Sequence, residues 1–191
     1  MIRLFFAFLV LGSISLALGQ SNTVGVLLQT PSSFDGYTLM PVTSSGNTYL
    51  IDNCGEVVQS WTSDYNAGMM AYLGDDGCLV RAGRTGNPNF LEGGAGGIIE
   101  IFDWDGDLKW SYLMSNDSIC QHHDLALMPN GNILALAWKS YDASSWIAMG
   151  RNPELTASVI WGTYIAELNP MADAGEEVVW EWEAFDHLAQ E

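Results

Sequence analysis

The chain has 191 residues and a formal net charge of −17, with six Lys and Arg against 23 Asp and Glu. A surface this acidic argues against binding to nucleic acids or to anionic membranes, both of which attract basic proteins. Eight Trp, seven Tyr and 20 Gly, together with very little Lys, are typical of a turn-rich β protein. The length is sufficient for one domain with a hydrophobic core.

Residues 1–19 are typical of a secretory signal peptide. Arg3 gives a positive start, Leu4 to Leu11 form a short apolar stretch, and Ala17-Leu18-Gly19 fits a cleavage site with small residues. We expect the mature protein to begin at Gln20 and to be secreted or periplasmic. The apolar stretch is too short for a typical spanning helix and no later segment could span, so we expect no membrane association after cleavage. A retained N-terminal anchor is the alternative.

Two kinds of hairpin alternate along the rest of the chain. The first has an apolar strand, an acidic turn ending in Gly and a strand ending in Trp or Tyr. It occurs at residues 48–61, 97–112 and 164–182. The second kind occurs at residues 69–83 and 123–137, where Asn130-Gly131 supplies the positive φ angles of a tight turn. Two hairpins make a four-stranded sheet, and such sheets repeating about every 40–50 residues indicate a β-propeller.

We therefore predict an all-β fold, a β-propeller of four-stranded antiparallel blades. Residues 20–191 would hold an incomplete set of about two and a half blades. The expected ranges are 34–61 (partial), 69–114, 122–182 and 185–191 (the start of the next blade). A propeller closes its ring with about four to eight blades, so we expect this chain to be the N-terminal part of a longer protein. Several copies closing one ring together is the alternative.

A long connection interrupts the second full blade at residues 139–160. Asp142 can cap a short helix over Ala143–Met149, Gly150 can end it, and Pro153 prevents the helix from restarting. The helix is either a rim element beside the mouth of the propeller or a solvated surface helix.

Two other features each have more than one interpretation. The glycine-rich residues 92–97 lack the spacing and the Lys-Ser/Thr of a phosphate-binding loop, which favours a flexible lead-in to the next strand. Of the three cysteines, Cys54 and Cys78 both fall in hairpin turns and are the favoured disulfide pair in an exported protein. Three reduced thiols, with Cys120, are the alternative.

The three histidines of the chain recur at one place in the repeat. His122 and His123 precede the first strand of one expected blade, and His187 precedes the first strand of the next. The first strand of each blade lines the central channel of a propeller, so all three histidines are expected at the channel mouth. Because neighbouring residues in a strand point to opposite faces, we expect either His122 or His123 to be a packed residue that points away.

Imidazoles at such a mouth have three uses: nucleophile, acid or base, and metal ligand together with Asp124 or Asp186. Arg81 and Arg84, which follow the strand of the first inner hairpin, could add a positive site for an anion. Surface salt bridges are the alternative for both arginines.

Several motifs, in their order and spacing, resemble the arylsulfotransferase-like family of secreted bacterial and archaeal proteins. They are GYTLMPV (36–42), TYLIDNCGEVVQSW (48–61), QHHDLALMPNGN (121–132), Gly150-Arg151 and VVWEWEAFDHL (178–188). The resemblance implies a β-propeller that moves a sulfuryl group from a phenolic sulfate to another phenol. It implies a channel histidine as the nucleophile, no nucleotide sulfate donor, and small-molecule partners, an aryl sulfate and a phenol acceptor.

These observations together give one predicted site. His123 and His187 are the expected catalytic residues, without a choice between them as nucleophile, and we expect no cofactor and no metal. The expected substrate-binding residues are His122, Asp124, Arg81 and Arg84. A non-catalytic propeller that binds a ligand or a protein at the same mouth is the alternative, and a metal-dependent hydrolase or lyase is a third hypothesis.

Overall fold

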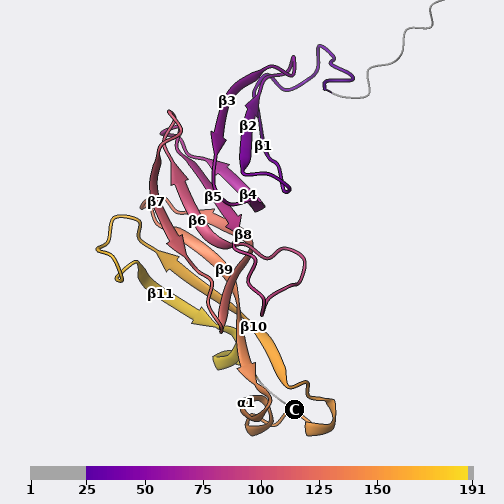
Figure 1. The fold of residues 1–191 in the computed structure, drawn as a ribbon, viewed down its shortest axis with the longest axis vertical. Coiled ribbons are helices and arrows are strands. Elements are labelled where there is room, and N and C mark those ends of the chain that lie inside the picture. Colours follow the sequence, from indigo (N-terminus) through magenta and orange to yellow (C-terminus); the bar gives the residue numbers. More distant parts are fainter. Residues whose placement is uncertain (1–24, 189–191) are drawn as a thin grey trace, which may run out of the picture.

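The computed structural model describes residues 25–188, which form three antiparallel sheets with few helical residues (Figure 1). The all-β class expected from the sequence is confirmed. Every sheet is a meander, because each strand pairs with the strand that follows it in the chain. The predicted signal peptide lies outside the described residues.

The first sheet has three strands and the other two have four each. The first sheet contains β1 (Thr38–Pro41), β2 (Asn47–Ile51) and β3 (Val57–Thr62). The second sheet contains β4 (Ala67–Leu73), β5 (Leu79–Arg84), β6 (Gly97–Phe102) and β7 (Leu108–Leu113). The third sheet contains β8 (Ile119–Leu127), β9 (Ile133–Asp142), β10 (Val159–Leu168) and β11 (Val178–Glu183).

The hairpin turns fall where the sequence predicted them. Gly131 between β8 and β9 has φ 86°, and Gly55 between β2 and β3 has φ 85°, a region that favours glycine. Side-chain oxygens close these turns: Asp52 Oδ1 accepts from the backbone N–H groups of Cys54 and Glu56, and Asn130 Oδ1 accepts from the backbone N–H of Asn132. The acidic turns are therefore explained by hydrogen bonds inside each turn.

The second and third sheets pack face to face, and their contact forms the main core. Ile99 from β6 and Ile133 from β9 are almost completely buried there, and each contributes roughly 1.5–3 kcal/mol by leaving water. Three buried alanines, Ala82, Ala135 and Ala166, keep this contact thin. The first strands of the two sheets, β4 and β8, pack against each other, and β1 packs against β4.

A buried ion pair inside the second sheet also makes hydrogen bonds to loops next to the first sheet. The guanidinium of Arg81 on β5 lies 3.4 Å from Glu100 on β6 and also donates to the carbonyls of Gly46 and Tyr65. Ser63 donates to the same carboxylate at 2.7 Å. Burial raises the pKa of Glu100, and the Ser63 hydrogen bond and Arg81 oppose this shift. Arg81 thus connects loops of the first sheet to the centre of the second.

The connection between β9 and β10 is shorter than predicted, because β9 continues to Asp142 and β10 begins at Val159. The expected helix forms as α1 (Ala143–Ala148), and Gly150 follows it with φ 101°. Pro153 does not merely stop this helix. It begins a 3-10 turn, η1 (Pro153–Leu155), whose preceding residue Asn152 accepts a hydrogen bond from the backbone of Glu154.

The helix α1 is anchored to the third sheet rather than solvated on all sides. Trp146 is buried, and its ring contacts Tyr141 of β9 and Phe185 with centroids 5.7 and 5.0 Å apart. Phe185 belongs to η2 (Ala184–His187), which follows β11. In Figure 1, α1 and the adjoining loop project beyond the sheets at the end where β10 begins.

We expect Glu100→Ala to lower the free energy of unfolding by about 3–5 kcal/mol, because it leaves the guanidinium of Arg81 buried without its counter-charge. The matched control is Lys109→Ala, which breaks a more exposed pair with Asp103 and should cost much less stability. Chemical denaturation of both variants measures the difference. Equal losses would contradict the role of the buried pair.

Candidate functional site

An irregularity in β8 brings His122 and His123 together. The register between β8 and β9 shifts between Gln121 and Leu125, and His123 has φ 52°, the one positive value among non-glycine residues in the described range 25–188. The strict alternation expected of strand neighbours is therefore broken, and the Nδ1 atoms of the two rings lie 2.8 Å apart. Backbone strain of this kind recurs at functional sites.

His122 is the packed histidine of the pair. Its exposed fraction is 8%, and its ring stacks on Trp138 of β9 with centroids 4.2 Å apart. Trp138 also contacts Phe90 and Trp161, so an aromatic cluster encloses one side of the imidazole. Burial and the neighbouring His123 lower the pKa of His122 to about 4, while the carbonyl of Ala137 opposes the shift. His122 is consequently neutral at physiological pH.

The glycine-rich residues 92–97 pack closely on this pair. The backbone N–H of His123 donates to the carbonyl of Gly94 at 2.8 Å, and a Cβ on Gly94 would stand 2.3 Å from the His123 ring. A Cβ on Gly96 would stand 2.0 Å from Gln121 Oε1. The glycines interpreted as a flexible lead-in are thus required for a close approach of backbone to β8.

Arg84 lies on the other side of this glycine segment. It ends β5, its side chain is exposed, and it lines a small pocket of about 210 Å³ together with Met69, Gly94 and Ala95. Gly94 lines this pocket and also packs against the His123 ring. Gly94 therefore has an exposed cation, Arg84, and an exposed imidazole, His123, as neighbours, near the start of β4 and the middle of β8.

Asp124 connects the two first strands. Its Oδ1 accepts a hydrogen bond from the Tyr72 hydroxyl of β4 and another from the backbone N–H of Leu125, both at 2.8 Å. The hydrogen bond to Asp124, followed by burial, raises the pKa of Tyr72. Asp124 thus lies next to the histidine pair, with one carboxylate oxygen already engaged.

Two predicted residues are not part of this cluster. Arg81 lies inside the protein on its pair with Glu100, so it offers no exposed charge to a ligand. His187 in η2 is exposed and stacks on Trp182 with centroids 5.1 Å apart. Within residues 25–188, no ring contact or hydrogen bond joins His187 to His122 or His123.

Sequence reasoning missed the residues that position the pair. Trp138 and Gly94 hold the two rings, and Phe90 extends the aromatic cluster from the loop before the glycines. The available signal was the density of glycine at residues 92–97, which indicates a close backbone approach as well as flexibility.

Other properties of the described residues limit the chemistry. Between residues 25 and 188, no group of three or more His, Cys, Asp or Glu side chains is arranged to hold a metal ion. All three cysteines are free thiols, so the favoured pairing of Cys54 with Cys78 is not present. In the same part of the chain, helices are too short or too polar to cross a membrane.

Comparison with known proteins adds no family to this description. No protein-family model matches the chain, and no curated protein matches its sequence. The resemblance of its motifs to the arylsulfotransferase-like family therefore stays a prediction.

The low pKa of His122 gives a testable pH dependence. Unfolded His122 takes up a proton near its ordinary pKa of 6.5, whereas the folded protein resists protonation down to about 4. Stability from this group is therefore complete above pH 6.5 and is lost as the pH falls toward 4, by at most about 3 kcal/mol. We expect His122→Phe, which can still stack on Trp138, to remove this part of the acid destabilisation.

The measurement is the free energy of unfolding of wild type and His122→Phe at pH 7.5 and pH 4.5. The control His187→Phe changes an exposed histidine and should retain the wild-type loss. The same loss in all three proteins would refute the assignment to His122.

Two neighbouring glycines offer a matched test of the close approach to His123. Gly94→Ala adds a methyl group against the imidazole at φ 91°, so we expect the ring to be displaced and stability to fall by roughly 1–3 kcal/mol. The methyl group of Gly93→Ala meets nothing within 4 Å, so this variant should leave the position of the His123 ring and the stability unchanged. The imidazole proton resonances of His123, assigned by NMR, report the displacement. Unchanged His123 resonances in Gly94→Ala would contradict the packing.

Proposed function

We propose that this protein transfers a sulfuryl group between phenolic compounds through His123, without a nucleotide sulfate donor. The observation that carries the proposal is the pairing of one exposed imidazole, His123, with one buried neutral imidazole, His122, at 2.8 Å. The motif resemblance to arylsulfotransferase-like proteins supplies the reaction class. We further propose that the protein is exported and that its sheets are blades of a β-propeller.

Two features of the fold support the propeller. Both four-stranded sheets are meanders of consecutive strands, and their first strands, β4 and β8, pack against each other as the inner strands of adjacent blades do. The glycine segment 92–97 and Arg84 line a pocket at the end where β4 begins, and the same segment packs on the histidine pair in the middle of β8. A channel mouth at that end would present them to a substrate.

The proposed chemistry uses one tautomer of the pair. A neutral imidazole has one N–H and one lone pair, so one Nδ1 of the contact must donate and the other accept. If His123 donates from Nδ1 to His122, the Nε2 of His123 keeps a lone pair and can act as a nucleophile. His122, whose ring stacks on Trp138, then accepts this hydrogen bond and acts as a positioning residue for His123.

The reaction proceeds in two displacements at sulfur. Nε2 of His123 attacks the sulfur of the aryl sulfate, an N–S bond forms, the S–O bond to the ring breaks, and the electron pair leaves on the phenolate oxygen. The hydroxyl oxygen of the acceptor then attacks the same sulfur, and the N–S electron pair returns to His123. The acceptor's proton ends on the released phenolate, so one phenol and one aryl sulfate are regenerated.

Arg84 is the proposed partner of the sulfate oxygens. Its exposed guanidinium lines a pocket whose wall includes Gly94, the glycine that packs against the His123 ring, and planar guanidinium groups bind oxyanions well. Preorganised positive charge of this kind stabilises charge that develops in a transition state. His123 rather than His187 is the proposed nucleophile. The His187 ring stacks on Trp182, and neither of these residues lines the pocket that contains Arg84.

The direct test is incubation of the full-length exported protein with 4-nitrophenyl sulfate and a phenol acceptor. We expect release of 4-nitrophenolate, and a sulfated histidine on the peptide that contains His123. His123→Ala should lower transfer on the order of 1,000-fold or more. The matched control His187→Ala should retain activity. Sulfation at His187, or full activity of His123→Ala, would overturn the assignment.

A second candidate function is a non-catalytic propeller that binds an anionic ligand at the same end. The inward position of Arg81 favours it, because a single arginine remains exposed beside His123. Binding of phenyl sulfate that is weakened by Arg84→Met, with no turnover and no labelled histidine across several phenols, would establish this function instead.

A further inference from the structure

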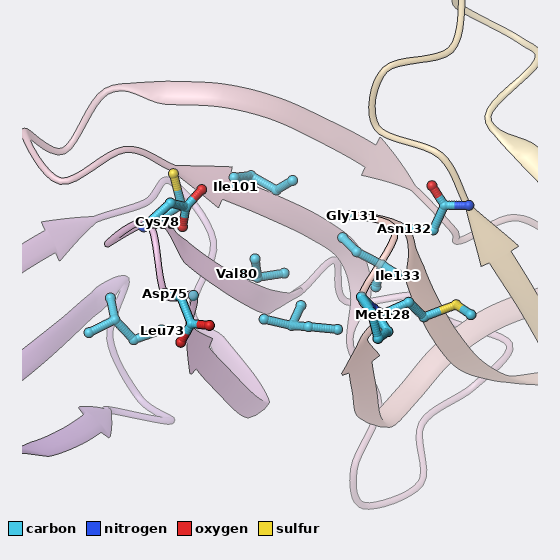
Figure 2. A pocket seen from close by; sticks show the side chains of 13 residues that line it. Leu73, Asp75, Cys78, Val80, Ile101, Met128, Gly131, Asn132 and Ile133 are labelled. Carbon is cyan, nitrogen blue, oxygen red and sulfur yellow. Dashed lines mark hydrogen bonds between the residues drawn. The ribbon is translucent and has the colours of Figure 1, made fainter.

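A separate cleft of about 660 Å³ lies between the second and third sheets, at the end of β4 and β8 opposite to the histidines (Figure 2). Its walls are the turn between β4 and β5 and the turn between β8 and β9. Val80, Ile101 and Ile133 line it and continue the apolar core between the sheets. Sites of about 300–1,000 Å³ with mainly apolar linings are typical for small organic ligands.

The polar groups of the cleft are acidic or are hydrogen-bond acceptors. Asp75 is exposed, and no hydrogen bond from residues 25–188 to its carboxylate is present. Asp76 accepts from the backbone N–H of Cys78 at 3.0 Å, which lowers its pKa and keeps it ionised. Asn132 donates its amide to Glu167 at 2.6 Å, so its Oδ1 remains as an acceptor. Among residues 25–188, no Lys or Arg lines the cleft.

We propose that this cleft binds an organic ammonium cation with an apolar body, such as an alkylamine or arylalkylamine. Two aspartates on the rim of an apolar floor complement a ligand with one positive end and one apolar end. An anion would be repelled by both aspartates, and a neutral apolar ligand would cover their carboxylates without supplying a partner. The inference is independent of sulfuryl transfer, because none of the cleft residues belongs to the histidine cluster.

Cys78 provides a readout inside the cleft. Its thiol is partly exposed and lines the site, as Figure 2 shows, whereas Cys54 is exposed and does not line it. Burial, with a smaller effect of Asp76, raises the pKa of Cys78. Because the thiolate is the form that is alkylated, the rate depends on pH, and all measurements are made at one fixed pH. A ligand in the cleft should slow alkylation of Cys78 by iodoacetamide and leave Cys54, the internal control, unchanged.

The experiment compares three probes with the same phenylbutyl body: 4-phenylbutylamine, 4-phenylbutanol and 4-phenylbutyrate. Alkylation of each cysteine in the reduced, full-length protein is followed by peptide mass spectrometry. We expect the amine to protect Cys78 at a concentration roughly five- to tenfold lower than the alcohol, and the carboxylate to give no protection. Equal protection by all three probes, or none by the amine at millimolar concentration, would overturn the proposal.

A charge-neutral variant separates the rim from the floor. Asp75→Asn removes one carboxylate without breaking a hydrogen bond of the fold, and it should raise the protective amine concentration several-fold with no change for the alcohol. Asp105→Asn alters an exposed aspartate in the turn between β6 and β7, outside the cleft. It should change neither the protective concentration of the amine nor that of the alcohol. Equal effects of the two variants would mean that general surface charge, rather than this site, attracts the amine.

Discussion

The thin contact between the second and third sheets determines where the candidate groups lie. Ala82, Ala135 and Ala166 are buried at this contact, and such short side chains let the two backbones come close. The same closeness continues beyond the strands, where the backbone N–H of Gly96 donates to the carbonyl of Gln121 and Gly94 accepts from His123. Larger side chains in either place would push β8 away from the glycine segment, and His123 would lose its support.

The two arginines of β5 show which parts of a site can be predicted from a sequence. The sequence placed Arg81 and Arg84 together, because both were expected to follow the same strand, whereas β5 includes both of them. In the structure they point to opposite faces, since residues three apart in a strand do so. Arg84 lies an even number of residues from Val80 and Ala82, so it is on the face of β5 that is turned to the third sheet. Arg81 is on the other face, which is turned to the first sheet. The difference depends on β5 being covered on both faces, which no local pattern in β5 indicates.

The histidine pair shows a second limit. Turn residues such as Asn130-Gly131 made the hairpin and its place in the sheet predictable, although only Gly131 takes the positive φ angle expected of both residues. The register shift before Leu125 was not predictable, because it places a histidine at positive φ, a conformation uncommon for such a residue. It is stabilised by contacts from distant segments, namely Gly94 and Trp138. Local propensity gave the strand, and tertiary packing set the geometry of the site.

The two ends of β4 and β8 carry opposite chemistry. Beside the start of β4 and the middle of β8, Arg84 and the imidazole of His123 are exposed, and where both strands end, Asp75 and Asp76 line an apolar cleft. Both ends are formed by the same two sheets, so a change that widens the gap between the sheets would disturb both. The Tyr72–Asp124 hydrogen bond lies between the two ends and ties the strands together. Replacement of one exposed charge leaves this hydrogen bond intact, so the two regions can be altered separately. An effect that spreads from one region to the other must therefore pass through the contact between the sheets.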